Sequence, residues 1–535
     1  MKRSFLSALA LLGVATLCGL GAHPASAQPA QPDMSKYILT PKPADTPRIN
    51  GARLFGVRPG SEFLYTIAAT GIRPMAFAAE GLPKGLKLDP ATGRITGRVK
   101  APGTYVVRLT ASNALGSNSR DLRIVVGDRI SLTPPMGWNS WNCWGQSVSQ
   151  ERVLSSARAM VEKGLIDHGW SYINIDDGWQ SRRGANGAIQ PNDKFPDMKA
   201  LSEEIHGMGL KLGIYSSPWV GTYAGHIGSY ADNDAGTYDW IEAGKYDEHY
   251  CVSDPEGKVS AGTNYRHGSR SFVREDVRQW GEWGVDYLKY DWNPNNYYHV
   301  REMYDALREL DRDVVFSLSN SAPYADAPMW MEYSNCWRTT GDIRDTWENM
   351  SAIGFSQDRW VAFNRPGSWA DPDMLVVGML GGAWGDLHYT KLTADEQYTH
   401  ISLWSLLAAP MLIGCDMARM DDFTVSLLTN DEVIDVNQDP LGLQAFPIWQ
   451  QGDQVIYVKH LEDGAMAVGF FNRGWQEVGM GISLRQLGLR GEQTVRDLWR
   501  QKDLTRTSDR FDTRVAPHGV VLVKFYPGNS REQHE

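Results

Sequence analysis

Cysteine is scarce in this chain, and the signature motifs of several common enzyme classes are missing from it. Five cysteines occur in 535 residues, and none of them belongs to a CxxC pair or to a zinc-type spacing. The histidines form neither HxH nor HExxH, which argues against a zinc hydrolase, and the GxSxG turn of serine hydrolases is absent. No GxGxxG follows a strand-like run, so a dinucleotide-binding fold is also disfavoured.

The chain has no excess of positive charge either. Its formal net charge is −10, whereas nucleic-acid binding requires clustered lysine and arginine, so we expect no nucleic-acid partner. Hydrophobic residues make up 42% and charged residues 22%, as in ordinary soluble proteins. Tryptophan, in contrast, is abundant, with 20 residues, and indole rings either pack in protein cores or stack on the apolar faces of sugars.

The N-terminus has the pattern of a secretory signal. Met1-Lys2-Arg3 precedes an apolar run from Phe5 to Gly21, and Ala25-Ser26-Ala27 forms an A-x-A cleavage site. The run is short for a membrane span, so we expect residues 1–27 to be removed and the protein to be exported to the periplasm or beyond, with no membrane anchor. The spacing of the remaining cysteines leaves any disulfide pairing open; they are Cys143, Cys251, Cys336 and Cys415.

Two regions of the mature chain have the pattern of all-β domains. Residues 28–36 are polar and proline-rich, which predicts a flexible lead-in. From 37 to 128, short β-type runs alternate with Pro, Gly and Asp turns, which predicts a β-sandwich. Similar runs predict an antiparallel β domain over 441–527, followed by a frayed tail at 528–535.

Between the two β regions, residues 132–440 alternate apolar strand-like runs with amphipathic helices. Repeated strand–helix units over this length favour a (β/α)8 TIM barrel over an open sheet. The long gap from 217 to 285 predicts an additional loop around Cys251. Eight runs are candidate barrel strands: Met136–Trp141, Ile173–Asp177, Leu212–Ser217, Tyr287–Asp291, Val314–Asn320, Trp337–Asp342, Trp369–Met374 and Leu406–Gly414.

Acidic and aromatic residues gather at the ends of these runs. In a TIM barrel, the carboxyl ends of the strands form the face that holds the active site. A single Asp there is often a helix cap or a loop hydrogen bond, but six or more on one face indicate acid/base and nucleophilic chemistry on a glycosidic bond. The strand-end residues are Trp141, Asp176, Asp177, Tyr215, Lys289, Asp291, Arg338, Asp342, Asp371 and Asp373.

A metal site is the alternative explanation for adjacent acids. Asp176 and Asp177 could together bind Mg or Ca. Neighbouring residues on a strand point in opposite directions, however, so both would reach one ion only from a bent strand end. We therefore predict no metal.

Five motifs give the chain a specific resemblance to a known family. In order along the chain, they resemble motifs of the family 27 glycoside hydrolases, the α-galactosidases: PMGWNSW at 135–141, IDDGW at 175–179, KYD at 289–291, WRTTGDI at 337–343 and DPDML at 371–375. In addition, residues 81–97 resemble immunoglobulin-like modules found beside secreted carbohydrate enzymes. For such a module, binding of substrate or cell wall and a passive spacer role both remain open.

The resemblance implies a retaining mechanism that needs no cofactor. Asp291 would be the nucleophile and Asp342 the acid/base, with carboxyl groups about 5–5.5 Å apart, and Asp345 is a nearby competitor for the second role. Lys289 is expected to favour the ionised form of Asp291. The resemblance also implies a sugar pocket in which Asp176 and Asp177 bind hydroxyls at O4 and O6, Lys289 and Arg338 bind further hydroxyls, and Trp141, Tyr215, Asp373 and Met374 complete the walls.

The chain departs from the family pattern at two places. Where animal and plant relatives have Cys-Glu-Trp at the 2-position of the sugar, this chain has Phe316 to Pro323, so we expect Ser319 or Asn320 to take over that contact. Asn293 stands where relatives have a disulfide cysteine.

The sequence thus predicts an exported exo-α-galactosidase that acts on terminal α-galactosyl groups of oligosaccharides or polysaccharides. α-N-Acetylgalactosaminidase and β-L-arabinopyranosidase activities, and a non-catalytic carbohydrate-binding protein, are the alternatives. The oligomeric state stays open.

Overall fold

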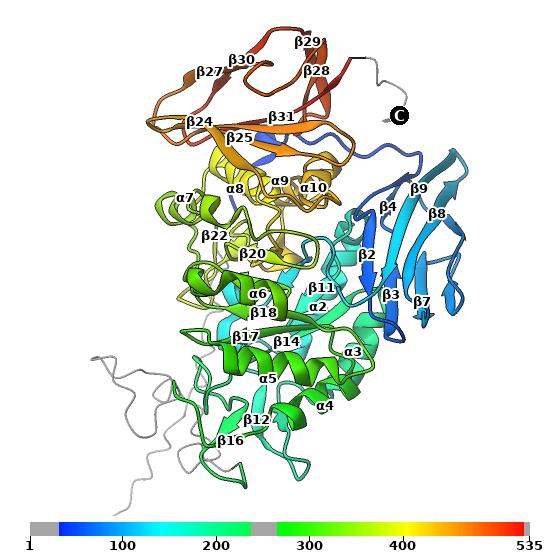
Figure 1. The fold of residues 1–535 in the computed structure, drawn as a ribbon, viewed down its shortest axis with the longest axis vertical. Coiled ribbons are helices and arrows are strands. Elements are labelled where there is room, and N and C mark those ends of the chain that lie inside the picture. Colours follow the sequence, from blue (N-terminus) through cyan, green and yellow to red (C-terminus); the bar gives the residue numbers. More distant parts are fainter. Residues whose placement is uncertain (1–30, 237–264, 529–535) are drawn as a thin grey trace, which may run out of the picture.

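The computed structural model describes residues 31–236 and 265–528. The predicted signal sequence, Cys251 and most of the predicted tail lie outside these ranges. Within them, two β domains flank a central α/β barrel, as Figure 1 shows. The predicted fold class, a TIM barrel with all-β regions on both sides, is confirmed.

Eight parallel strands form the barrel, and each of them falls within or beside one of the eight predicted runs. They pair in the order β20-β19-β18-β17-β14-β11-β10-β23. A single parallel bridge between Leu375 and Ile413 joins the two ends of this order and closes the circle. The strands are β10 (Met136–Asn139), β11 (Tyr172–Asn174), β14 (Lys211–Ser216), β17 (Tyr287–Asp291), β18 (Val315–Ser319), β19 (Cys336–Arg338), β20 (Trp369–Asp371) and β23 (Met411–Ile413).

Helices cover the outside of the barrel, and local sequence signals set their ends. Ser149 accepts a hydrogen bond from the Arg152 amide at the start of the helix at 150–162, and Gly284, with φ 89°, ends the helix that leads into β17. The main helices are α2 (Gln150–Glu162), α3 (Met198–Gly207), α4 (Val273–Trp283), α5 (Tyr297–Arg308), α6 (Ala327–Tyr333), α7 (Trp347–Gly354), α8 (Ala394–Leu406), α9 (Asp422–Leu428) and α10 (Asp431–Asn437).

The N-terminal β domain packs against the end of the barrel where the strands begin. Arg58 donates from its amide and from Nε to Asp313, just before β18. A cavity of about 630 Å³ remains between the two parts. The domain has a four-stranded sheet, β2 (Leu54–Val57), β9 (Gly116–Val126), β8 (Gly103–Asn113) and β5 (Ala76–Glu80), and a three-stranded sheet, β3 (Glu62–Thr66), β7 (Arg94–Arg98) and β6 (Leu86–Leu88).

The C-terminal β domain covers α8, which is consequently buried on all sides. Trp499 donates from Nε1 to Ser402 of this helix at 2.9 Å, and His518 contacts Glu396 at 2.7 Å. The main sheet contains β24 (Phe446–Gln451), β25 (Gln454–His460), β26 (Met466–Asn472), β31 (Val520–Pro527), β28 (Gln493–Asp497) and β29 (Lys502–Thr507); β27 (Val478–Ser483) pairs with β30 (Arg510–Val515).

Short pairs of antiparallel strands lie in the loops that follow the barrel strands. Residues 217–231 form a long loop after β14. The paired segments are β12 (Gln180–Arg183) with β13 (Ile189–Pro191), β15 (Tyr230–Ala231) with β16 (Arg270–Ser271), and β21 (Met379–Leu380) with β22 (His388–Tyr389).

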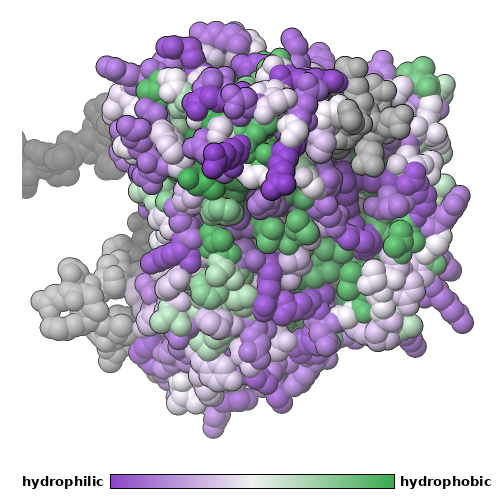
Figure 2. Space-filling model, turned by 45° about the horizontal axis from the view of Figure 1, so that its top comes forward, coloured by the Kyte–Doolittle hydropathy of each residue, from purple (hydrophilic) through white to green (hydrophobic). Residues whose placement is uncertain are grey.

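The surface is mainly hydrophilic. Figure 2 shows hydrophobic residues in separate patches across the middle of one face, between polar side chains. None of the helices in the described ranges combines the length and the apolar character needed to cross a bilayer. Cys143, Cys336 and Cys415 are buried and unpaired, and Cys251 lies outside the described residues.

Candidate active site

Asp291 stands at the carboxyl end of β17 and is 5% exposed. Neutral groups bind both of its carboxyl oxygens. Tyr215 of β14 donates its hydroxyl to Oδ2 at 3.0 Å, and Asn320, directly after β18, donates its side-chain amide to Oδ1. Asn320 has a left-handed backbone, with φ 60°, which asparagine tolerates better than most residues. Three neighbouring strands therefore fix the position of this carboxylate.

Lys289 forms its ion pair with Asp176, not with Asp291. Its Nζ lies 2.8 Å from Oδ2 of Asp176, whose Oδ1 accepts the Asp177 amide at 2.8 Å. Strand β11 ends at Asn174, so both adjacent acids lie in the loop beyond it. Burial alone would lower the pKa of Lys289, but the carboxylates of Asp176 and Asp291 raise it above its usual range.

Asp177 is buried, and its two carboxyl oxygens differ in their hydrogen bonding. Its Oδ2 accepts the Ala224 amide at 2.9 Å, whereas its Oδ1 has no hydrogen-bond partner among the described residues. Burial raises the pKa of Asp177 to about 7, and the nearby charges of Asp176 and Asp291 act in the same direction. An uncompensated acceptor of this kind is costly unless a ligand hydroxyl binds to it.

Arg338, Asp342 and Asp373 form a second charged cluster, after β19 and β20. Arg338 is 3% exposed, and its Nη2 lies 2.9 Å from Asp373 Oδ2 and 3.3 Å from Asp342 Oδ1. Asp373 also accepts the Ile343 amide at 2.8 Å and has a left-handed backbone, with φ 82°. The side chain of Asp342 is 46% exposed, so this carboxyl can exchange protons with solvent.

The two predicted catalytic acids influence each other electrostatically. Burial raises the pKa of Asp291 to about 6; Lys289 opposes this, and the charge of Asp342 adds to it. Burial also acts to raise the pKa of Asp342, but Arg338 and Lys289 outweigh it and hold that pKa below its usual range. Lys289 therefore favours the ionised form of Asp291, as expected, but burial of this carboxyl has the larger effect on its pKa.

The other predicted pocket residues occupy varied positions. Trp141 begins the short helix α1 (Trp141–Trp144) and is partly buried. The hydroxyl of Ser319 and Nε of Arg338 are buried without a hydrogen-bond partner in the described part of the chain. Met374 is 6% exposed beside Asp373.

The competing acid Asp345 has other partners. Its side chain is 8% exposed, lies 3.0 Å from Nε2 of His388 and accepts the Lys391 amide at 3.0 Å. These contacts tie Asp345 to the β21–β22 hairpin.

Tyr223 is a site residue that sequence reasoning missed. Burial raises its pKa, and the charges of both Asp291 and Asp342 raise it further. Its ring packs against Trp219 at 5.2 Å and Tyr265 at 5.1 Å between centroids. Tyr223 lies in the 217–231 loop, which has no periodic pattern that could have revealed it.

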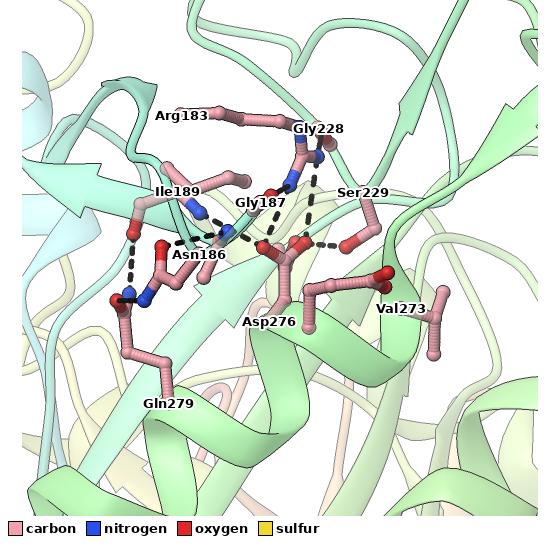
Figure 3. A network of polar contacts seen from close by, with 12 residues as sticks. Arg183, Asn186, Gly187, Ile189, Gly228, Ser229, Val273, Asp276 and Gln279 are labelled. Atoms are coloured by element: carbon pink, nitrogen blue, oxygen red, sulfur yellow. Dashed lines mark hydrogen bonds and ion pairs between the residues drawn. The ribbon is translucent and has the colours of Figure 1, made fainter. Parts of the chain in front are cut away.

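A buried ion pair anchors this loop. Arg183 and Asp276 of α4 lie 2.8 Å apart with side chains 3% and 0% exposed, and Arg183 also donates to the carbonyl of Gly228 at 2.6 Å. Figure 3 shows how the carboxylate of Asp276 additionally accepts the Ile189 amide, at 2.9 Å, and contacts Ser229. The network therefore connects a hairpin, a helix and the loop that carries Tyr223 and Ala224.

A metal ion has no ready set of ligands in the described chain. Across residues 31–236 and 265–528, no three His, Cys, Asp or Glu side chains gather in a way that could hold one.

Three family models match the chain. The model "Alpha galactosidase A" matches residues 133–266 and 257–439, and "Alpha galactosidase C-terminal beta sandwich domain" matches 451–525. The model "Putative Ig domain" matches 46–127.

Characterised relatives and solved structures agree with these matches. The chain is 35% identical to alpha-galactosidase 2 of Arabidopsis thaliana over 409 residues, 75% of this chain and 91% of that protein. It is 32% identical to alpha-galactosidase A of Cellvibrio japonicus, covering 75% and 93%. A Bacteroides fragilis structure described as a "putative alpha-galactosidase/melibiase" is 35% identical with a TM-score of 0.78, covering 90% of this chain and 98% of that one. A β-L-arabinopyranosidase from Geobacillus stearothermophilus is 27% identical with a TM-score of 0.64, covering 75% and 98%.

Proposed function

Since the chain belongs to the α-galactosidase family of glycoside hydrolases, family 27, we propose that it is a retaining exo-α-galactosidase that removes terminal α-galactosyl groups. The observation that carries the proposal is the pairing of Asp291 with Asp342. One carboxyl is buried and held by Tyr215 and Asn320, and the other is half exposed beside Arg338. A fixed nucleophile and a solvent-accessible acid/base are what double displacement requires.

In the first step, Asp291 attacks the anomeric carbon while Asp342 gives its proton to the departing glycosidic oxygen. A covalent galactosyl–enzyme ester forms on Asp291, and the leaving group departs as an alcohol. In the second step, Asp342 takes a proton from water, the resulting hydroxide attacks the anomeric carbon, and Asp291 leaves as a carboxylate. Two inversions restore the original α configuration.

The reaction needs a proton on Asp342 and none on Asp291. In the free site a single proton shared by the two acids lies on Asp291 instead, because the pKa of Asp291 is raised and that of Asp342 is lowered. A bound sugar that takes over hydrogen bonds from Arg338 weakens the hold of this arginine on Asp342. The pKa of Asp342 then rises, as a general acid requires.

Unsatisfied polar atoms support the proposed position of the sugar. Oδ1 of Asp177, Oγ of Ser319 and Nε of Arg338 are buried without partners among the described residues. Hydroxyl groups of a galactosyl ring can satisfy all three, which would offset their desolvation. In this proposal Asp176 and Asp177 bind O4 and O6, and Ser319 and Asn320 take the 2-position.

Initial rates on three nitrophenyl glycosides test the substrate. We expect the α-galactoside to be cleaved fastest, ahead of the α-N-acetylgalactosaminide and the β-L-arabinopyranoside, because the latter lacks the C6 hydroxyl that Asp177 would bind. Proton NMR of the first product should show α-galactose before mutarotation. Appearance of the β anomer first, or no cleavage of any of the three, would refute the proposal.

The predicted export is tested separately. Residues 1–27 lie outside the described structure, and sequencing of the mature N-terminus should find Gln28 first. Recovery of the full-length chain from the cytosol alone would contradict export.

A further inference from the structure

A shallow groove on the C-terminal β domain has the chemistry of a saccharide site. It has a volume of about 380 Å³ and lies at the turn between β24 and β25 and the loop between β26 and β27. Trp475 lies beside it with 76% of its surface exposed. Around the indole are Gln451, Gln454 and Gln476, whose side chains make no hydrogen bond within the described chain, together with Asp453. An aromatic face with amide and carboxylate groups at its edge suits the apolar face and the hydroxyl rim of a sugar ring.

The exposed indole packs against an aromatic neighbour. His518 lies between Trp475 and Trp347, with ring centroids 4.3 Å and 4.0 Å away, and the Trp347 contact is a parallel stack. Nδ1 of His518 lies 2.7 Å from Glu396 at the start of α8, which fixes the imidazole. A platform that is ordered before binding loses little conformational entropy when a ligand stacks on it.

The groove lies on the side of the molecule on which the pocket of the predicted catalytic acids opens to solvent. Trp347 begins α7, five residues after Asp342, so their Cα atoms are at most about 18 Å apart. Between the two, Arg344 stacks on Trp384 of the β21–β22 hairpin at 3.6 Å, and Trp384 is 38% exposed. Figure 1 shows α7 and β22 on the left of the barrel with β24 above them, away from the N-terminal β domain.

We propose that the groove at Trp475 is a second saccharide-binding site, which holds the neutral main chain of a polymeric galactoside while a galactosyl side group occupies the catalytic pocket. None of the residues that line the groove belongs to the predicted catalytic pocket, so we expect the groove to act only on substrates long enough to reach both sites. This inference rests on the proposed galactosidase function for its link to turnover, but binding at the groove can be measured without turnover.

Affinity electrophoresis tests the binding. Wild type, Trp475→Ala and Trp475→Phe are run in gels that contain galactomannan, a polysaccharide with single α-galactosyl side groups, plus saturating free galactose to block the pocket. We expect wild type to be retarded, Trp475→Phe to keep most of the retardation, and Trp475→Ala to bind about fivefold to tenfold more weakly, as loss of one stacking contact implies. Leu504→Ala is the matched control, because it removes another exposed apolar side chain (44%) from the same domain.

Kinetic measurements provide a second test of the proposed site. Trp475→Ala should lower kcat/KM on galactomannan about fivefold to tenfold and leave kcat/KM on nitrophenyl α-galactoside within about twofold. Equal retardation of Trp475→Ala and wild type, or loss of wild-type retardation when galactose is added, overturns the second site. If wild type fails to cleave nitrophenyl α-galactoside, the proposed function fails, and the galactose-blocked gels still decide whether the groove binds saccharide.

Discussion

Replacing Asp177 by Asn should stabilise the folded protein at neutral and higher pH while it impairs catalysis. Folding raises the pKa of this carboxyl from 3.8 to about 7, mainly through burial. The folded state therefore binds the proton more tightly than the unfolded state, and stability falls as pH rises from about 4 to about 7. At about 1.4 kcal/mol for each tenfold change in proton affinity, the ionised carboxylate costs on the order of 4 kcal/mol above pH 7.

Asparagine keeps an acceptor for the Ala224 amide and removes the charge, so it should escape this cost. We expect the unfolding temperature of Asp177→Asn to exceed that of wild type by several degrees at pH 8 and to be nearly equal at pH 4. Differential scanning fluorimetry across this pH range measures the effect. The same variant should lose about tenfold to hundredfold in kcat/KM on nitrophenyl α-galactoside, because a charged acceptor for a sugar hydroxyl is lost.

Asp193→Asn is the control, since Asp193 is exposed and its substitution should change stability by no more than about 0.5 kcal/mol at any pH. An advantage of Asp177→Asn that does not grow with pH, or a variant less stable than wild type at pH 8, would refute the reasoning about the buried charge.

Four further outcomes are expected. Asp291→Gly should abolish turnover, and azide should restore it with formation of a galactosyl azide of inverted anomeric configuration, detectable by NMR; unaided near-wild-type activity would contradict the nucleophile role. Asp342→Ala should still glycosylate the enzyme from substrates with very good leaving groups and then stall, giving a burst by stopped flow; steady turnover at the wild-type rate would count against it. Plots of kcat/KM against pH should fall as pH rises through about 6, because the free site then loses the single proton that Asp342 must donate; a flat profile between pH 5 and pH 8 would rule this out. Asn320→Ala should lower kcat and move this limb to higher pH, because the hydrogen bond from the Asn320 side-chain amide that favours the carboxylate of Asp291 is lost; a lower kcat with an unmoved limb would indicate a merely structural role.

The barrel could be predicted because its strands are short apolar runs that end in charge. All eight predicted runs contain or adjoin a barrel strand, but several extend past the strand end. Asp176, Asp342 and Asp373 lie in loops beyond β11, β19 and β20. Sequence reasoning placed these residues at the right end of the barrel, because chemistry at strand ends depends on order along the chain and not on exact boundaries.

Contacts between loops could not be predicted in the same way. The effect of the two acids on the pKa of Tyr223 depends on a loop held by Arg183 and Asp276, which are 93 positions apart in the chain. Likewise, the partner of Lys289 is Asp176 from another strand end, although Asp291 is closer in sequence. The catalytic and sugar-binding roles of the predicted site residues stay predictions until the variants above are measured.

The bridge between Leu375 and Ile413 gives the barrel one weak seam. Two backbone hydrogen bonds, from the Leu375 amide to the Leu412 carbonyl and from the Gly414 amide to the Leu375 carbonyl, hold it at 2.8 and 3.1 Å, whereas β17 pairs over four residues with β14 and over five with β18. Leu375 lies two residues after Asp373. Asp373 forms an ion pair with Arg338, which in turn contacts Asp342. Local opening of the barrel at this bridge would therefore displace Asp342 first, while Asp291 keeps its position. Hydrogen–deuterium exchange should begin at this seam.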